Sequence, residues 1–194
     1  MSQTRRIDQN VFRRATILVA EGDRALRRTL RDVLLGMGFP NVYLAGTMAE
    51  TLRQIVENEP TVILLDHRLP GGDGLTLTRR LRRDGGSYSR RPVVLMAETP
   101  DLALVAAARD AGVNEIVVKP LSVEALILRL MHVLKLPRPF IRSPAFVGPD
   151  RRRLGERRAG ERRHDQPLSL QDLDRRRPPG RRTGEDRRRM PTGR

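Results

Sequence analysis

Five short apolar runs alternate with longer amphipathic stretches between residues 15 and 136. Short apolar runs are typical of strands buried on both faces of a parallel sheet, because helices cover both sides of such a sheet. The longer stretches place apolar residues three and four positions apart, which is the spacing of one helix face. The pattern therefore predicts strands at 15–20, 41–45, 62–66, 92–97 and 115–118, each followed by a helix.

Residues that cap helices precede four of the predicted helices. A hydroxyl or carboxylate at such a position accepts a hydrogen bond from the free N–H groups of the first turn. Thr47 and Glu50 form a capping box, and Pro100 after Thr99 suits the first position of a helix. We expect the caps to be Asp23, Thr47, Thr99 and Ser122, and the five helices to end near residues 36, 58, 83, 111 and 134.

Strands and helices that alternate at these lengths predict right-handed crossovers between parallel strands. We therefore expect one α/β domain over residues 15–136, built on a five-stranded, doubly wound parallel sheet. Residues 1–14 are expected to form a flexible, basic lead-in to this domain.

Positive charge is concentrated behind the domain. The net charge of the chain is +15, and residues 137–194 carry +10 of it, with 18 arginines and 8 acidic residues. Glycine, an acid and paired arginines recur in this Pro/Arg-rich tail, which we expect to be disordered because it can bury little apolar area. Four apolar residues can hold its first part against the domain: Phe140, Ile141, Phe146 and Val147. The arginines are consistent with a solvated tail or with weak binding to a polyanion.

Composition excludes several kinds of chemistry. The chain has no cysteine, so it has neither a disulfide framework nor a thiolate nucleophile. Its start does not read as a signal peptide, and no apolar stretch is long enough to span a membrane, so we expect a cytoplasmic protein. The histidines lack metal-ligand spacing, and no glycine-rich phosphate-binding motif is present.

Three of the predicted strands end on residues that suit a phosphoryl group. The first strand is followed by Glu21, the third ends on Asp66, and the fifth is followed by Lys119. The carboxyl ends of parallel strands meet at one edge of a sheet, where ligands bind. We therefore expect these side chains to converge although they lie far apart in the sequence.

The motifs around these residues resemble the receiver domain of response regulators in two-component signalling. Asp66 is followed by a Leu-Pro-Gly-Gly-Asp-Gly loop, Lys119 by Pro120, and Ala-Gly precedes the fifth strand. The resemblance covers residues 15–136 and implies a flavodoxin-like fold, in agreement with the strand pattern. It implies that Asp66 is the phosphoacceptor and that Lys119 binds the phosphoryl group. Pro120 matches a proline of the family that is usually cis.

The resemblance also implies a metal and partners. Mg²⁺ would be held by Glu21, Asp66 and the backbone carbonyl of Arg68, and would offset negative charge on the transferring phosphoryl group. A histidine kinase or a phosphotransfer protein would supply that group. A downstream protein would bind the surface between Leu102 and Leu134.

Three positions depart from the family pattern. Gly22 stands where a second metal-binding acid is usual, Ala97 where a Ser or Thr is usual, and Ile116 where an aromatic residue is usual. We therefore expect weak Mg²⁺ binding, and a conformational switch that is impaired or replaced, because a ligand shifts an equilibrium only through contacts that differ between the two states. Thr99 can supply a displaced hydroxyl, although the helix cap is the interpretation we favour.

The favoured hypothesis is a stand-alone response regulator that is phosphorylated on Asp66 and signals through protein contacts. Such a domain is a phosphoacceptor and no independent enzyme; at most it dephosphorylates itself. Two alternatives remain: a phosphorylation-independent pseudo-receiver that acts as a binding module, and a nucleic-acid or polyanion binder that uses the Arg-rich tail.

Overall fold

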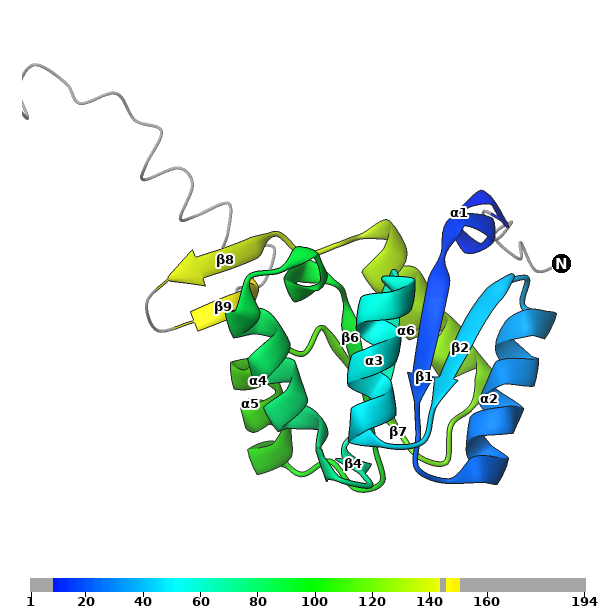
Figure 1. The fold of residues 1–194 in the computed structure, drawn as a ribbon, viewed down its shortest axis with the longest axis horizontal. Helices are drawn as coiled ribbons and strands as arrows, with labels where there is room; N and C mark the ends of the chain where they lie inside the picture. The colour runs from blue at the N-terminus through cyan, green and yellow to red at the C-terminus, as the bar shows by residue number, and fades with distance from the viewer. Residues whose placement is uncertain (1–8, 144–145, 151–194) are drawn as a thin grey trace, which may run out of the picture. The chain divides into compact units, whose positions relative to one another are not determined.

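A five-stranded parallel sheet forms the centre of the molecule (Figure 1). The computed structural model describes residues 9–143 and 146–150 of the chain. The strands lie in the order β2 (Asn41–Ala45), β1 (Thr16–Ala20), β3 (Val62–Asp66), β6 (Val93–Ala97) and β7 (Glu115–Val118). Every neighbouring pair is parallel, with Ala20 opposite both Ala45 and Leu65. The predicted doubly wound α/β fold is therefore confirmed.

Helices cover both faces of this sheet, and each face has its own hydrophobic core. One core lies beneath α1 (Gln9–Arg14), α2 (Arg24–Gly36) and α6 (Val123–Lys135) and includes Phe12, Leu34 and Leu130. The other core lies beneath α3 (Met48–Asn58), α4 (Gly74–Asp84) and α5 (Leu102–Ala111) and includes Ile55, Leu81 and Ala108. The strands contribute alternate residues to the two cores, which explains why their sequences are apolar throughout.

Three of the four expected helix caps are confirmed. Asp23 accepts a hydrogen bond from the Leu26 N–H at 2.7 Å, and Thr47 and Ser122 accept equivalent bonds at the starts of α3 and α6. The expected cap at Thr99 is wrong, because α5 begins at Leu102 and the carboxylate of Asp101 accepts from the Leu104 N–H at 2.6 Å. A carboxylate at this position also interacts favourably with the positive end of the helix dipole, which a hydroxyl does not.

Two segments expected to lack regular structure contain it. The lead-in includes α1, where the Phe12 ring packs against Phe39 with centroids 4.4 Å apart. The start of the tail forms an antiparallel hairpin of β8 (Phe140–Ser143) and β9 (Phe146–Pro149). The expectations of a flexible 1–14 and a disordered tail from 137 are therefore wrong for these two segments. The rest of the expected disorder concerns residues 1–8, 144–145 and 151–194, which lie outside the described residues.

The hairpin lies near the amino ends of the strands, at the opposite end of the sheet from β4 (Arg68–Leu69) (Figure 1). Arg82, near the end of α4, is only 2% exposed and lies with its guanidinium carbon 5.1 Å from the centre of the Phe140 ring. Gly112 and Gly148 allow the hairpin to approach closely, since a Cβ on Gly148 would lie 3.0 Å from the Cα of Gly112. Aromatic packing and close backbone contact thus hold the hairpin against the domain.

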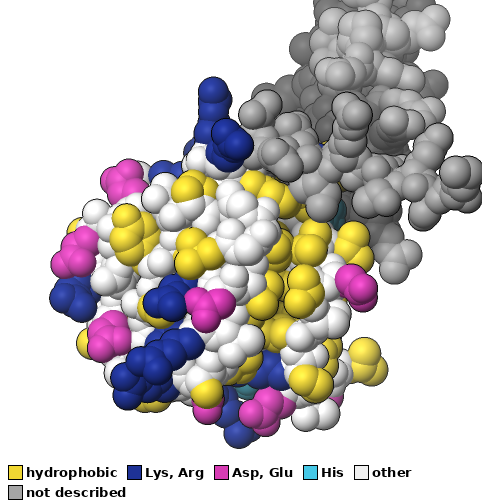
Figure 2. All heavy atoms as spheres, turned by 90° about the vertical axis from the view of Figure 1, so that its right-hand side faces the viewer, with side chains coloured by type: hydrophobic (Ala, Val, Ile, Leu, Met, Phe, Trp, Pro, Cys, Tyr) yellow, Lys and Arg dark blue, Asp and Glu magenta, His cyan; other side chains and the backbone are white. Residues whose placement is uncertain are grey.

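The described surface mixes side chains of both charge signs with hydrophobic ones. Figure 2 shows this on one face, where hydrophobic side chains gather in a patch beside interspersed basic and acidic residues. Among the helices that the structure describes, none has the length and apolar character needed to cross a bilayer.

Candidate functional site

The carboxyl ends of β1, β3 and β7 bring Glu21, Asp66 and Lys119 together. The Lys119 Nζ lies 2.7 Å from Glu21 Oε2 and 3.0 Å from Asp66 Oδ2, so one ammonium joins both carboxylates. Glu21 is 2% exposed and Asp66 is nearly as buried. The three side chains line a cleft of about 530 Å³ that opens to solvent. The convergence expected from strand-end positions is thus present in the structure.

Burial and pairing shape the charges of this site. Burial raises the pKa of Glu21, although its hydrogen bond to Lys119 acts in the opposite direction. Burial alone would lower the pKa of Lys119, but hydrogen bonds and attraction to Glu21 and Asp66 outweigh it, so the pKa is raised. Lys119 is therefore a cation at neutral pH, and it partly compensates the two carboxylates.

The loop after β3 presents the Asp66 carboxylate to the cleft. Its Oδ1 accepts a hydrogen bond from the Arg68 N–H at 3.2 Å, while Oδ2 contacts Lys119. The short strands β4 and β5 (Gly72–Asp73) pair across a turn at Gly71, whose φ is +87°. A Cβ on Gly74 would lie 2.4 Å from the Asp66 carbonyl oxygen, so the start of α4 requires glycine. The glycines of this loop therefore allow the backbone conformation that positions Asp66.

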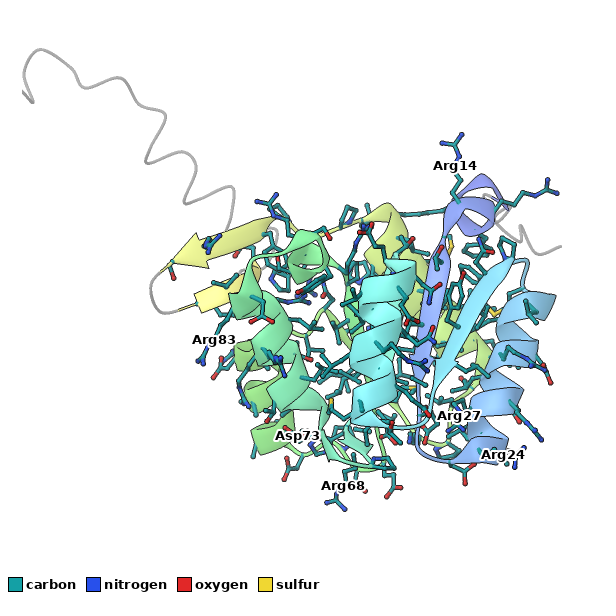
Figure 3. The ribbon with its side chains drawn as sticks, viewed as in Figure 1. Arg14, Arg24, Arg27, Arg68, Asp73 and Arg83 are labelled. Atoms are coloured by element: carbon teal, nitrogen blue, oxygen red, sulfur yellow. The ribbon has the colours of Figure 1, made fainter. Side chains whose placement is uncertain are left out.

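The turn after β1 holds Glu21 in place through backbone contacts. Its Oε1 accepts a hydrogen bond from the Asp23 N–H at 2.9 Å, while the Asp23 side chain caps α2 as expected. Arg27 donates to the carbonyl oxygens of Glu21 and Gly22, a role that the sequence analysis missed. Figure 3 shows Arg27 at the end of the domain where Arg68 and Asp73 also lie. The position of Arg27, one turn after the Asp23 cap, could have indicated this role, because long helical side chains point back toward the N-terminus of the helix and here toward the end of β1.

The donors for a metal ion are few. In the part of the chain that the structure describes, no three His, Cys, Asp or Glu side chains gather as a metal cluster. Gly22 contributes no carboxylate, and a Cβ there would lie 2.9 Å from the Cδ of Pro70. Mg²⁺ is commonly held by one or two carboxylates and several waters, so Glu21, Asp66 and the Arg68 carbonyl suit a weakly held ion.

The remaining positions of the expected site line the cleft or the adjacent strands. Ala97 ends β6 opposite Val118 and lines the cleft together with Thr99. Ile116 lies opposite Leu95 and packs, half-buried, against the core beneath α3, α4 and α5. The peptide bond between Lys119 and Pro120 is cis. Neither Ala97 nor Ile116 can supply the hydroxyl or the aromatic ring that the resemblance associates with switching.

His67, next to Asp66, contacts the cap of α4 rather than the site carboxylates. Its Nε2 lies 3.5 Å from Asp73 Oδ1, and its side chain is partly exposed. Asp73 accepts hydrogen bonds from the N–H and the hydroxyl of Thr76, and these bonds outweigh burial and lower its pKa. His67 therefore belongs to the loop that supports the site.

Comparisons with known proteins agree with this geometry. Residues 17–131 match the family described as response regulator receiver domain. A response regulator MprA from Mycobacterium sp. (strain KMS) is 33% identical over 123 residues, which cover 63% of this chain and 52% of that protein. The KDP operon transcriptional regulatory protein KdpE of Escherichia coli (strain K12) is 33% identical over 134 residues, covering 69% of this chain and 55% of that protein. The chain thus spans about half the length of the curated relatives it matches.

Solved structures show the same likeness. A putative response regulator from Chloroflexus aurantiacus aligns with a TM-score of 0.58 and 30% identity, covering 62% of this chain and 98% of that one. A two-component response regulator from Clostridium difficile aligns with a TM-score of 0.58 and 26% identity, covering 63% and 98%. On its sequence, its fold and its matched residues, the chain belongs to the response regulator receiver family.

Proposed function

We propose that Asp66 accepts a phosphoryl group from the phosphohistidine of a histidine kinase or a phosphotransfer protein. Receiver domains are phosphoacceptor domains of two-component signalling and interact with such proteins. In the proposed step an Asp66 carboxylate oxygen bonds to phosphorus, the bond from phosphorus to the histidine nitrogen breaks, and the released imidazole takes up a proton. The carboxylate at the cleft, held 3.0 Å from the Lys119 ammonium, is the observation that carries the proposal.

Lys119 would act as a fixed cation during the transfer. Its ammonium already contacts Asp66, so it can stabilise the negative charge that develops on the phosphoryl oxygens during the transfer. The same ammonium contacts Glu21 at 2.7 Å, which keeps it oriented before the donor arrives. Lys119 therefore supplies electrostatic stabilisation that needs little rearrangement.

Receiver domains generally bind Mg²⁺ at the phosphorylation site, and we propose that this chain binds it weakly. Glu21, Asp66 and the Arg68 carbonyl would hold the ion, which supplies neutralising charge to a phosphoryl group when bound. Gly22 in place of an acid is the reason for the low affinity. The one catalytic activity that we propose for this site is dephosphorylation of its own Asp66.

The output of the domain would pass through protein contacts on α5, β7 and α6. Several large apolar side chains stand exposed there: Leu102 (89% exposed), Leu128 (68%), Val105, Val118 and Val123. Exposed apolar side chains that gather on one surface are typical of protein interaction sites. Because Ala97 and Ile116 lack the usual switching groups, we propose that partner binding at this surface senses Asp66 through backbone shifts of the β6 and β7 ends.

Intact-mass measurement after incubation with acetyl phosphate and Mg²⁺ tests the phosphoacceptor. We expect one added phosphoryl group on the full chain and none on Asp66→Asn. Asp23→Asn is the matched control, since it removes a carboxylate from the same cleft but keeps a good helix cap. The same added mass on Asp66→Asn would overturn the assignment of Asp66.

A phosphorylation-independent pseudo-receiver is the second candidate. The absence of an acid at Gly22 and of a hydroxyl at Ala97 favours it. No added mass from acetyl phosphate or from a phosphorylated histidine donor, with binding of a partner unchanged by Asp66→Asn, would support it. Stand-alone action, a cytoplasmic location and polyanion binding by the Arg-rich tail of residues 137–194 stay predictions.

A further inference from the structure

A second cavity lies at the end of the domain remote from Asp66. It has a volume of about 280 Å³ and is formed by the end of α4, the turn η1 (Ser87–Arg90) and the hairpin. We call it the arginine cavity, and it is lined by Arg82, Gly85, Gly86, Ser87, Ser89, Arg90, Phe140, Arg142 and Val147. No acidic residue is among the residues that line it. Every charged side chain that borders the cavity is therefore positive.

Arg82 supplies a buried positive charge that has no acidic partner among the residues that the structure describes. Its nitrogens donate to the carbonyls of Gly112, Ser89 and Arg91 and to the amide oxygen of Asn114, at 2.8 to 3.0 Å. Burial lowers the pKa of Arg82 to about 10, so the guanidinium stays charged at neutral pH. Dipoles of carbonyl groups spread this charge but do not cancel it. Arg82 thus acts on the cavity through its field, since its donors are already used.

Two further arginines border the cavity, Arg90 from η1 and Arg142 from β8. Among the described residues no acid lies within ion-pair distance of Arg90 or Arg142, and both side chains are exposed. Ser89 also lines the cavity and is only 7% exposed. Its hydroxyl can donate a hydrogen bond to a polar ligand in the cavity, because a serine hydroxyl both donates and accepts.

We propose that the arginine cavity binds a phosphate group of a small phosphoanion through Arg90 and Arg142. The planar guanidinium presents paired N–H groups that match phosphate oxygens, and serine hydroxyls add donors without adding charge. A volume of 280 Å³ accommodates a pyrophosphate-sized group. The chain beyond the hairpin is a poor occupant, since residues 151–194 hold 16 arginines and 7 acidic residues, a net charge of +9.

This site depends on the hairpin. Arg142 comes from β8, which lies beyond residues 17–131 that match the receiver family. A neighbouring hollow of about 190 Å³ adds Arg79, Arg83 and the acidic Asp110 beside the same Arg82 and Val147. Arg83 projects outward from α4 next to the hairpin in Figure 3. Phosphate binding would therefore link the end of α4 to a segment that the family domain itself lacks.

Isothermal titration of the full chain with inorganic pyrophosphate tests the site. We expect saturable one-site binding that weakens about tenfold in Arg142→Gln and in Arg90→Gln, because each removes a charge-assisted contact. Arg53→Gln is the matched control: it removes the same charge from an exposed position of α3 that lines neither hollow. Ser89→Ala, which leaves the charge unchanged, should weaken binding by a smaller factor.

A second titration with a short single-stranded oligonucleotide distinguishes the source of the phosphate. If Arg142→Gln weakens the binding of pyrophosphate, the ligand is a small phosphoanion. If Arg142→Gln weakens only the binding of the oligonucleotide, the cavity binds a nucleic-acid phosphate instead. Equal affinities of the Arg142→Gln, Arg90→Gln and Arg53→Gln variants for both probes would place binding in the tail and overturn the proposal. No binding of either probe would overturn it as well. None of these outcomes depends on phosphorylation of Asp66.

Discussion

Each end of the sheet holds a cation that is largely covered by the protein, Lys119 half-buried and Arg82 buried, and the two cations are compensated in different ways. At the carboxyl ends of the strands Lys119 contacts two carboxylates, at 2.7 and 3.0 Å. At the amino ends Arg82 contacts carbonyl and amide oxygens, with no acid among its partners. A proton, a metal or a phosphoryl group can change the net charge around Lys119, because its partners are carboxylates. The carbonyl groups around Arg82 do not change their charge in this way. The Lys119 site is therefore suited to respond, and the Arg82 site is suited to hold structure.

One helix connects these two sites. The N–H of Gly74, at the start of α4, donates to the His67 carbonyl at 2.9 Å, directly after β3 and Asp66. Arg82, in the last turn of α4, reaches the residues that precede β6 and β7 and the ring of Phe140. A rigid helix anchored at both ends transmits small displacements because packed interiors deform little. The comparison thus predicts that Arg82 variants affect stability most and that Lys119 variants affect the charge balance of the site.

Arg82→Met should give the largest effect, a loss of about 4 kcal/mol in the free energy of unfolding. Methionine fills similar volume but leaves the carbonyls of Gly112, Ser89 and Arg91 without donors. Urea denaturation followed by circular dichroism measures the change. Arg83→Met is the control, since Arg83 is exposed and should change stability by less than about 0.5 kcal/mol. Equal effects of the two substitutions would contradict a structural role for Arg82.

Lys119→Met should lower the free energy of unfolding by about 3 kcal/mol at neutral pH, because Glu21 and Asp66 lose their shared cation. The pKa of Lys119 in the folded protein lies above its ordinary value of 10.5. Its contribution is therefore complete below pH 10.5 and is lost as the pH rises through the folded pKa. In denaturation curves of both proteins between pH 7 and pH 11.5 the difference in stability should shrink once the pH passes 10.5, and a constant difference across this range would contradict the pairing.

Gly22→Asp should raise the affinity for Mg²⁺ about tenfold by adding a third carboxylate to the site. The Pro70 ring must shift to accommodate it, since a Cβ at Gly22 would lie 2.9 Å from its Cδ. Isothermal titration with Mg²⁺ measures the affinity. Gly36→Asp adds the same charge where a Cβ would meet nothing within 4 Å, and it should leave Mg²⁺ affinity unchanged. An unchanged affinity in Gly22→Asp would show that the turn after β1 does not face the ion.

The sheet and the central side chains of the site were predictable from the sequence because both depend on strand ends. Apolar runs marked the five strands to within one residue, and the ends of three of them placed Glu21, Asp66 and Lys119 at one edge. Local chemistry also identified the caps at Asp23, Thr47 and Ser122. These features rest on short-range patterns, so no knowledge of tertiary contacts was needed.

The hairpin and the supporting arginines were missed because long-range contacts create them. Four apolar residues of β8 and β9 were expected to hold this segment against the domain, but the strands themselves depend on the ring of Phe140 against Arg82 and on close backbone approach at Gly112. Arg27 and Arg82 look like two more arginines in an arginine-rich chain until the carbonyls they bind are brought together by folding. Tertiary context overrides local propensity at such positions.

The start of α5 gives the smallest and most local comparison of expectation with structure. The Asp101 carboxylate accepts a hydrogen bond from the Leu104 N–H at 2.6 Å, whereas Thr99, which lines the same cleft as Asp66 and Asp101, does not cap the helix. Asp101→Ala should therefore lower the free energy of unfolding by about 1 kcal/mol, and Thr99→Ala should leave it nearly unchanged. In a phosphorylation assay the order should reverse, so that Thr99→Ala slows phosphorylation more than Asp101→Ala does. The reason is that only Thr99 can place a hydroxyl near Asp66, in a site where Ala97 has none. A stability loss in Thr99→Ala equal to that in Asp101→Ala would return the cap to Thr99, and an unchanged phosphorylation rate in Thr99→Ala would leave the cleft without a substitute hydroxyl.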